Sequence, residues 1–319
     1  MERILVTGGG GFIGSHLARY LYEHGNFVRV ADIKYDNYIK EEYCNEKLAL
    51  DLREYSNCLR ATENIDKVYN LAANMGGIGF ITLVSADVMR DNVLINVNML
   101  QASVANKIKR FFFSSSACVY PNYKQTNPDV LGLKEEDAYP ADPNEAYGWE
   151  KLFTEEMTKA YKSDYGLDIR IARYHNVYGP EGTYKGGREK APAAICRKVA
   201  EASDPGKILI WGDGKATRSY CYIDDCIAGT VSLMDSDYDK PLNIGSDRLI
   251  SVEDLADMVI GISGKKIEKE HDLSAPQGVR GRNADLTLAK KMLGWEPKVS
   301  LEDGIARTYL WIKRMIEEI

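Results

Sequence analysis

Tyr147 and Lys151 are spaced to lie side by side on a helix, because residues four apart are neighbours on a helix surface. A phenol has a pKa of about 10, so it is a poor base at neutral pH unless a nearby ammonium stabilises the phenolate. We therefore predict that Lys151 lowers the pKa of Tyr147. Ser116 ends the run Phe-Phe-Phe-Ser-Ser-Ser at the close of a predicted strand, where open α/β sheets bind ligands. Together these three residues are suited to removing a proton from a hydroxyl group.

Cys118 follows Ser116 by two positions, so we expect it on the same loop. A lone cysteine usually behaves as a small apolar side chain. A thiol becomes an effective base, however, when a nearby cation stabilises its thiolate, and Lys190 is the candidate cation. On spacing alone, packing and catalysis both remain open for Cys118.

A glycine-rich turn follows the first predicted strand and opens the first predicted helix. It is read as G-x-x-G-x-x-G with Gly8, Gly11 and Gly14, or as G-x-G-x-x-G beginning at Gly9. Glycines here permit a tight turn and close approach of a pyrophosphate to backbone amides. Asp32 ends the second strand, where a carboxylate accepts the ribose hydroxyls and repels a 2′-phosphate. The pattern predicts a dinucleotide site that takes NAD rather than NADP.

Three basic, glycine-flanked segments lie in the second half of the chain, at residues 185–190, 211–219 and 278–283. Arginine forks suit bidentate contacts with phosphate, and lysines add point charge. For any single arginine, a solvated surface position is the simpler interpretation. Three such clusters in an acidic chain instead favour a small diphosphate ligand.

Alternating strand and helix patterns must position these residues. The predicted strands are Ile4–Thr7, Phe27–Asp32, Lys47–Leu50, Lys67–Leu71, Arg110–Ser114 and Asp168–Arg173. The predicted helices between them are Phe12–His24, Leu52–Thr62, one near Val84–Asn106, and Ala146–Tyr165. This alternation predicts an α/β fold, a Rossmann-type doubly wound parallel sheet covered on both faces.

After about Tyr174 the alternation fades. We expect a helix near Ala191–Ala202, strands at Ile208–Trp211 and Arg218–Tyr222, and capped helices starting after Ser251 and Ser300. The predicted division is an NAD-binding domain over residues 1–175 and a smaller α/β nucleotide-sugar domain over 176–319. A helix near Ile223–Met234 is expected to return to the first domain.

Length and composition bound the function. The chain has 319 residues, of which 45% are hydrophobic and 28% charged, which is typical of a globular protein that buries a sizeable core. Its net charge of -6 argues against a general nucleic-acid binder. The sequence shows neither a bilayer-length apolar run nor a C-x-x-C pair, so we expect no membrane partner and no metal. The expected location is the reducing cytoplasm.

Four segments carry a closer resemblance. Residues 70–77 (NLAANMGG), 115–118 (SSAC), 186–194 (GGREKAPAA) and 278–283 (GVRGRN) resemble the GDP-mannose 3,5-epimerase family of the extended short-chain dehydrogenase/reductase superfamily. The resemblance runs over nearly the whole chain. It implies an isomerase with tightly bound NAD that converts GDP-mannose to GDP-L-galactose, and to GDP-L-gulose when C5 alone is epimerised. It also implies a homodimer built on the two long helices.

The resemblance assigns roles to individual residues. The implied catalytic residues are Ser116, Cys118, Tyr147, Lys151 and Lys190, with Cys118 and Lys190 as the epimerisation pair. The implied cofactor-binding residues are Gly8, Gly11, Phe12, Ile13, Gly14, Asp32, Asp51, Leu52, Ala72, Ala73, Tyr147 and Lys151. The implied substrate-binding residues are Gly76, Ser116, Ala117, Cys118, Asn176, Glu189, Lys190, Lys198, Ala216, Thr217, Arg218 and Arg282.

Other functions compete with this one. A UDP-sugar 4-epimerase needs the tyrosine, lysine and serine but no thiol–lysine pair. A 4,6-dehydratase would need an adjacent acidic pair in place of Ala117 and Cys118. A non-catalytic NAD-sensing module is a further alternative, against which the intact Ser116, Tyr147 and Lys151 argue.

Overall fold

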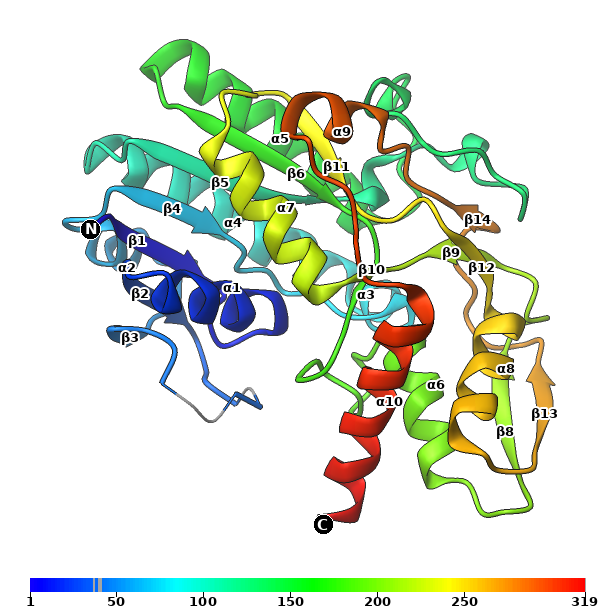
Figure 1. The fold of residues 1–319 in the computed structure, drawn as a ribbon. Coiled ribbons are helices and arrows are strands. Elements are labelled where there is room, and N and C mark those ends of the chain that lie inside the picture. The colour runs from blue at the N-terminus through cyan, green and yellow to red at the C-terminus, as the bar shows by residue number, and fades with distance from the viewer. Residues whose placement is uncertain (37, 40–41, 319) are drawn as a thin grey trace.

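A seven-stranded parallel sheet forms the centre of the molecule (Figure 1). The computed structural model describes residues 1–36, 38–39 and 42–318. The sheet order is β11-β6-β5-β4-β1-β2-β3. Its strands are β1 (Arg3–Thr7), β2 (Phe27–Asp32), β3 (Glu46–Ala49), β4 (Lys67–Asn70), β5 (Arg110–Ser116), β6 (Ile169–Tyr174) and β11 (Pro241–Ile244). The predicted doubly wound α/β fold is confirmed.

Helices cover both faces of this sheet. In Figure 1, α1 and α7 lie on one face, and α4 and α5 on the other. The helices are α1 (Phe12–Glu23), α2 (Tyr55–Thr62), α3 (Ile78–Leu83), α4 (Ser85–Ala105), α5 (Ala146–Tyr165), α6 (Ala191–Glu201), α7 (Ile223–Asp235), α8 (Val252–Ser263), α9 (Thr287–Leu293) and α10 (Leu301–Glu317). Short 3-10 turns occur at η1 (Ala117–Val119), η2 (Asn122–Lys124) and η3 (Glu135–Ala138).

Strand β5 shows why these strands lack an alternating pattern. Phe111 and Phe113 point into the core beneath α2 and α4, whereas Phe112 points into the core on the opposite face. All three are fully buried. A parallel strand with helices on both sides is apolar on both sides.

The remaining short strands lie beside the sheet with α6, α8 and α10 (Figure 1). They pair as β7 (Val177–Tyr178) with β10 (Cys221–Tyr222), as β8 (Gly206–Trp211) with β13 (Ile267–Asp272), and as β12 (Leu249–Ser251)-β9 (Thr217–Ser219)-β14 (Gly281–Arg282). The predicted strand Arg218–Tyr222 is two strands, because β9 belongs to the β12-β9-β14 sheet whereas β10, after Tyr220, pairs with β7. The predicted caps are present: Ser251 accepts from the amide of Asp254, and Ser300 from that of Asp303.

Two elements of the second half complete the sheet layers. Strand β11 pairs with β6, and α7 packs against α1 and β6.

Neither β11 nor α3 was predicted from the sequence. Helix α2 begins at Tyr55 rather than Leu52, because the Leu52 side chain packs into the core ahead of the helix.

Candidate active site

The glycine-rich turn joins β1 to α1 with the compactness that a dinucleotide site requires. Gly8 has a φ of +69°, and a Cβ at Gly14 would stand 2.1 Å from the carbonyl oxygen of Gly8. The Asp32 carboxylate lies against this turn and accepts the Gly10 amide at 2.9 Å. Burial raises the pKa of Asp32, while amides of the turn and of the residues after β2 lower it. This cradle, with a carboxylate at the end of β2, fits a dinucleotide.

Other predicted cofactor residues line the same end of the sheet. Phe12 and Ile13 begin α1 and are half-buried. The amide of Ala72 donates to Thr7 on β1, and Ala73 follows it, half-buried. Asp51 is held by the Arg53 guanidinium, and the Leu52 side chain lies in the core, so Leu52 presents only its backbone to a ligand.

Ser116, Tyr147 and Lys151 come together between the end of β5 and the start of α5. The Ser116 side chain lies close enough to Tyr147 to lower its pKa. The Lys151 ammonium lies 5.5 Å from the centre of the Tyr147 ring, and both side chains are buried. The predicted placement on one helix face is thus present in the structure.

The prediction that Lys151 lowers the pKa of Tyr147 is wrong, because this pKa is raised. Burial raises the pKa of Tyr147 well above its usual value, the charges of Cys118 and Glu150 raise it further, and the nearby Ser116 side chain lowers it in part. Burial also lowers the pKa of Lys151, which weakens the cation that would stabilise a phenolate. Spacing places the pair correctly but carries no information about desolvation.

Cys118 is the middle residue of η1, the 3-10 turn that Ser116 caps, and it is partly buried. Its amide donates to the Ser116 hydroxyl at 3.2 Å, and the Arg282 guanidinium donates to its sulfur at 3.3 Å. Burial raises the pKa of Cys118, but Arg282, the Ser116 side chain and Lys190 together outweigh it, so the pKa falls below its usual value. Lys190 was the expected cation, and Arg282 has the larger effect.

Lys190 reaches the site because its segment packs against residues 74–77. The Gly77 amide donates to the Arg188 carbonyl at 3.1 Å, and a Cβ at Gly77 would stand 2.7 Å from the Glu189 carbonyl oxygen. Gly76 lies in the same turn, against Phe80. Burial lowers the pKa of Lys190, although Cys118 raises it in part. An amine of this kind exchanges its proton closer to neutral pH than a surface lysine does.

Two arginines from neighbouring strands lie in register beside the thiol. Arg218 of β9 pairs with Arg282 of β14. Burial lowers the pKa of Arg218 to about 10, and the charge of Arg282 adds to that effect. Two guanidiniums held together in this way are suited to an anionic diphosphate.

Most of the other predicted substrate residues contact neighbouring protein groups. Asn176, between β6 and β7, donates to the Ser219 carbonyl at 3.1 Å. Thr217 hydrogen-bonds the Pro128 carbonyl, and the carbonyl of Ala216 accepts from Val252. Ala117 is buried in η1.

Glu189 and Lys198 are held by protein partners. The Glu189 carboxylate accepts from the Gly187 amide at 2.7 Å and from Arg197 at 3.3 Å. The Lys198 ammonium donates to the Leu209 carbonyl at 2.5 Å and lies over the exposed Trp211 ring.

Sequence reasoning missed two residues that shape the site. A Cβ at Gly148 would stand 2.2 Å from the Cys118 carbonyl oxygen, so α5 approaches η1 closely only with glycine there. Gln125 is buried and accepts from Arg282 at 2.6 Å. Gly148 directly follows Tyr147, and a glycine inside a helical pattern is a signal of close packing. Nothing local marks Gln125.

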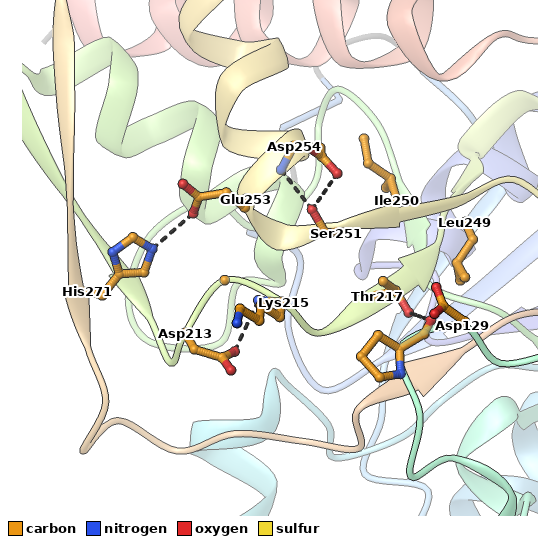
Figure 2. Close-up of a pocket in the computed structure, with 12 residues that line it drawn as sticks. Asp129, Asp213, Lys215, Thr217, Leu249, Ile250, Ser251, Glu253, Asp254 and His271 are labelled. Atoms are coloured by element: carbon orange, nitrogen blue, oxygen red, sulfur yellow. Dashed lines mark hydrogen bonds and ion pairs between the residues drawn. The ribbon is translucent and has the colours of Figure 1, made fainter.

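A separate cavity of about 660 Å³ lies between the β9-β12-β14 sheet and β13 (Figure 2). Of the predicted site residues only Thr217 lines it. Figure 2 shows lining side chains paired with one another: His271 with Glu253 at 2.9 Å, and Ser251 with Asp254 at 2.6 Å. The cavity lacks Ser116, Cys118, Tyr147 and Lys151, so it is not the catalytic site described above.

Two absences hold for the described part of the chain. None of its helices combines the length and apolar composition needed to cross a bilayer. No group of three or more His, Cys, Asp or Glu side chains is arranged to hold a metal ion.

One family model and several proteins of known name match this chain over most of its length. The model of the NAD dependent epimerase/dehydratase family matches residues 4–245. GDP-mannose 3,5-epimerase of Arabidopsis thaliana is 49% identical over 99% of this chain and 83% of its own length. UDP-glucose 4-epimerase of Thermotoga maritima, solved with UDP-glucose, superposes with a TM-score of 0.89 at 28% identity, over 98% of this chain and 99% of that one. UDP-glucuronic acid 4-epimerase of Bacillus cereus, solved with UDP-glucuronic acid and NAD, gives a TM-score of 0.84 at 28% identity, over 99% and 100%.

The family model spans the glycine turn, Ser116, Tyr147 and Lys151, and its matched range ends just after β11. The resemblance noted in the sequence, the NAD cofactor and the enzyme class agree with this match. The chain belongs to the NAD dependent epimerase/dehydratase family.

Proposed function

We propose that this chain epimerises GDP-mannose at C3 and C5 to GDP-L-galactose, and forms GDP-L-gulose when C5 alone reacts. The observation that supports this best is the Cys118 thiol, which Arg282 contacts at 3.3 Å beside Ser116. A 4-epimerase has no use for a second acid–base group at that position. The identity of 49% to a protein named GDP-mannose 3,5-epimerase supports the same substrate.

The first step is oxidation at C4. The turn at Gly8–Gly14 and the Asp32 carboxylate would hold NAD, which when bound accepts a hydride from C4 and later returns it. Tyr147 takes the proton of the C4 hydroxyl, and Ser116 hydrogen-bonds O4. Lys151, whose ammonium lies 5.5 Å from the centre of the Tyr147 ring, is assigned to the cofactor beside the tyrosine.

The second step is proton exchange. A ketone at C4 acidifies the protons on C3 and C5, because their removal leaves an enolate. We assign the base to the Cys118 thiolate and the acid on the opposite ring face to the Lys190 ammonium. The lowered pKa values of both groups support this pairing near neutral pH. Proton transfer by a placed side chain contributes roughly 10²- to 10⁴-fold.

The diphosphate is assigned to the basic residues that border the thiol. Arg218 and Arg282 provide the paired guanidiniums, Lys190 interacts with Arg282, and Asn176 and Lys198 are assigned to the same ligand. The Gly76 turn would let backbone approach the hexose. In this arrangement Arg282 serves both the phosphates and Cys118.

Assembly and location are inferred from separate features. Met89 and Leu94 on α4, and Trp149 and Phe153 on α5, are exposed large apolar side chains on two helices that pack together. Such a surface supports a two-fold homodimer, the commonest closed symmetry. The six cysteines are free thiols, which supports a reducing, cytoplasmic compartment.

One experiment tests the function. The purified holoprotein is incubated with GDP-α-D-mannose in D₂O, and the C3 and C5 proton signals are followed by NMR. We expect both to exchange. Inversion at C4 of UDP-glucose without exchange at C3 or C5 would establish the 4-epimerase instead. Bound NAD with no conversion of either sugar would support the sensing module.

A further inference from the structure

The Gln125 side chain is buried and every polar atom on it has a defined partner. Its amide nitrogen donates to the carbonyls of Tyr120 at 3.0 Å and Pro121 at 3.1 Å. Its amide oxygen then faces the other way and accepts from Nε of Arg282 at 2.6 Å. Because the two carbonyls accept only from the nitrogen, they fix which end of the amide Arg282 meets.

The backbone of Gln125 fixes the strand that carries Arg282. The amides of Arg280 and Gly281 donate to the Gln125 carbonyl at 2.9 Å and 3.2 Å. Residue 125 therefore holds Arg282 twice, through the main chain before it and through its own side chain. The other end of the guanidinium donates to the sulfur of Cys118 at 3.3 Å.

Arg282 is placed by this contact, because a free arginine has several rotamers of similar energy. Holding Nε with one planar acceptor sets the plane of the guanidinium and thus the direction of its terminal nitrogens. One of those nitrogens then points at the Cys118 thiol.

We propose that Gln125 is a positioning residue, which holds the Arg282 guanidinium on Cys118 and so favours ionisation of the thiol. Only the catalytic use of the thiolate rests on the proposed function. The thiol's ionisation itself is measurable without any sugar.

Other titratable groups also face Cys118. Tyr147 and Lys151 on α5, Lys190 ahead of α6, and Arg218 on β9 each interact with its charge. Within the described residues, the Gln125 side chain hydrogen-bonds Arg282 and none of these four. Loss of the Gln125 amide also frees the Tyr120 and Pro121 carbonyls, which closely follow Cys118, so the Arg282→Lys background is needed to separate the two routes.

The test measures the alkylation rate of Cys118 by iodoacetamide as a function of pH, in the holoprotein, by mass spectrometry. The other five cysteines are buried, and Cys118→Ala gives the background. Gln125→Met keeps an unbranched side chain and removes the acceptor. We expect the midpoint of the profile to rise by about one pH unit, which is roughly tenfold less thiolate below the midpoint.

The same change is then made in an Arg282→Lys background. If Gln125 acts through the guanidinium, Gln125→Met has no further effect on the midpoint there. An equal rise in both backgrounds, or an unchanged midpoint in the single variant, would overturn the proposal. Should Gln125→Met not fold, as judged by circular dichroism, Gln125→Asn replaces it. That side chain is one methylene too short to reach both the carbonyls and Arg282, and the midpoint is expected to rise in the same direction.

The outcome is separable from the proposed function. A shifted midpoint in a protein whose wild type exchanges no C3 or C5 proton would keep Gln125 as a positioning residue and reject the epimerase. If the wild type exchanges the C3 and C5 protons but Gln125→Met leaves the alkylation midpoint unchanged, the epimerase is supported and the positioning role of Gln125 is rejected.

Discussion

The Cα of Gly148 lies so near Cys118 that an added Cβ would stand 2.2 Å from the Cys118 carbonyl oxygen. The first turn of α5, which carries Tyr147, is therefore seated on the 3-10 turn that carries the thiol. One close backbone contact fixes the distance between the group assigned to oxidation and the group assigned to proton exchange.

Gly148→Ala is expected to force these two elements apart and reduce epimerase activity by at least about 10²-fold, since small misplacements of catalytic groups have effects of this size. Gly261→Ala in α8 is the matched control, because a Cβ there meets nothing within 4 Å. That control should keep full activity and gain about 0.5–1 kcal/mol of stability. Steady-state rates and urea unfolding measure both. Full activity in Gly148→Ala would show that the contact is not needed.

Cys118→Ala is expected to separate oxidation from epimerisation. The variant should retain NAD, bind GDP-mannose and form NADH transiently, seen by absorbance, yet lose deuterium incorporation at C3 and C5. Tyr147→Phe should give neither signal, because the acidifying ketone never forms. Exchange at the wild-type rate in Cys118→Ala would show that the thiol only packs, and would favour the 4-epimerase.

Asp32→Ala tests the cofactor preference. The carboxylate that accepts the Gly10 amide at 2.9 Å is the group placed to receive the ribose hydroxyls. Since hydrogen bonds to charged groups contribute about 1.5–3 kcal/mol, NAD affinity should fall roughly 10- to 100-fold and discrimination against NADP should relax. Asp36→Ala, an exposed carboxylate paired with Lys34, is the control. If direct titration shows that Asp32→Ala leaves the affinity for NAD and the affinity for NADP unchanged, the assignment is rejected.

The proposed dimer surface is tested by charge. Leu94→Glu combined with Phe153→Glu places two carboxylates on exposed apolar positions of α4 and α5. Light scattering should give about twice the chain mass of 35.8 kDa for the wild type and a single chain mass for the variant. Leu310→Glu, exposed on α10, should leave the assembly unchanged. A wild type that scatters as one chain at micromolar concentration contradicts the dimer.

His175 makes stability depend on pH in a defined window. It is fully buried, and burial lowers its pKa from 6.5 to about 3, although the hydrogen bond with Asn243 opposes this. Between those values the unfolded chain binds the proton and the folded chain does not, so stability rises with pH and is lost as pH falls below 6.5. The contribution is about 1.4 kcal/mol for each pH unit in that window.

His175→Phe should reduce the acid dependence of the free energy of unfolding by that amount. Urea unfolding at pH 8, where the imidazole is neutral in both states, gives the packing cost of the substitution alone. A slope between pH 6.5 and 4 that matches the wild type would mean that His175 does not titrate differently on unfolding.

Local pattern explains what could be predicted from the sequence. The strands from β1 to β6 and helices α1, α4 and α5 follow from apolar runs and helical spacing. The glycine turn and the Tyr147–Lys151 pair are visible because their partners lie within a few residues. Strand β11 is short, with no periodicity to mark it.

Contacts between distant residues could not be predicted. Arg282 meets Cys118 across a sequence separation of 164 residues, and Gln125 meets Arg282 across 157. Side-chain type and local spacing carry no trace of either contact. The pKa of Tyr147 was misjudged for a related reason, because desolvation depends on everything packed around a group rather than on the nearest charge.

The position of β11 has a consequence for how the chain is made. Strand β6 is buried along its whole length, and one of its edges is covered only by residues 241–244. A ribosome that has released residues 1–175 has therefore delivered six strands of a sheet whose outer edge is unpaired. Such an edge is a template for pairing with other chains. A fragment cut there would be expected to aggregate, and nascent chains would need shielding until α7 and β11 emerge.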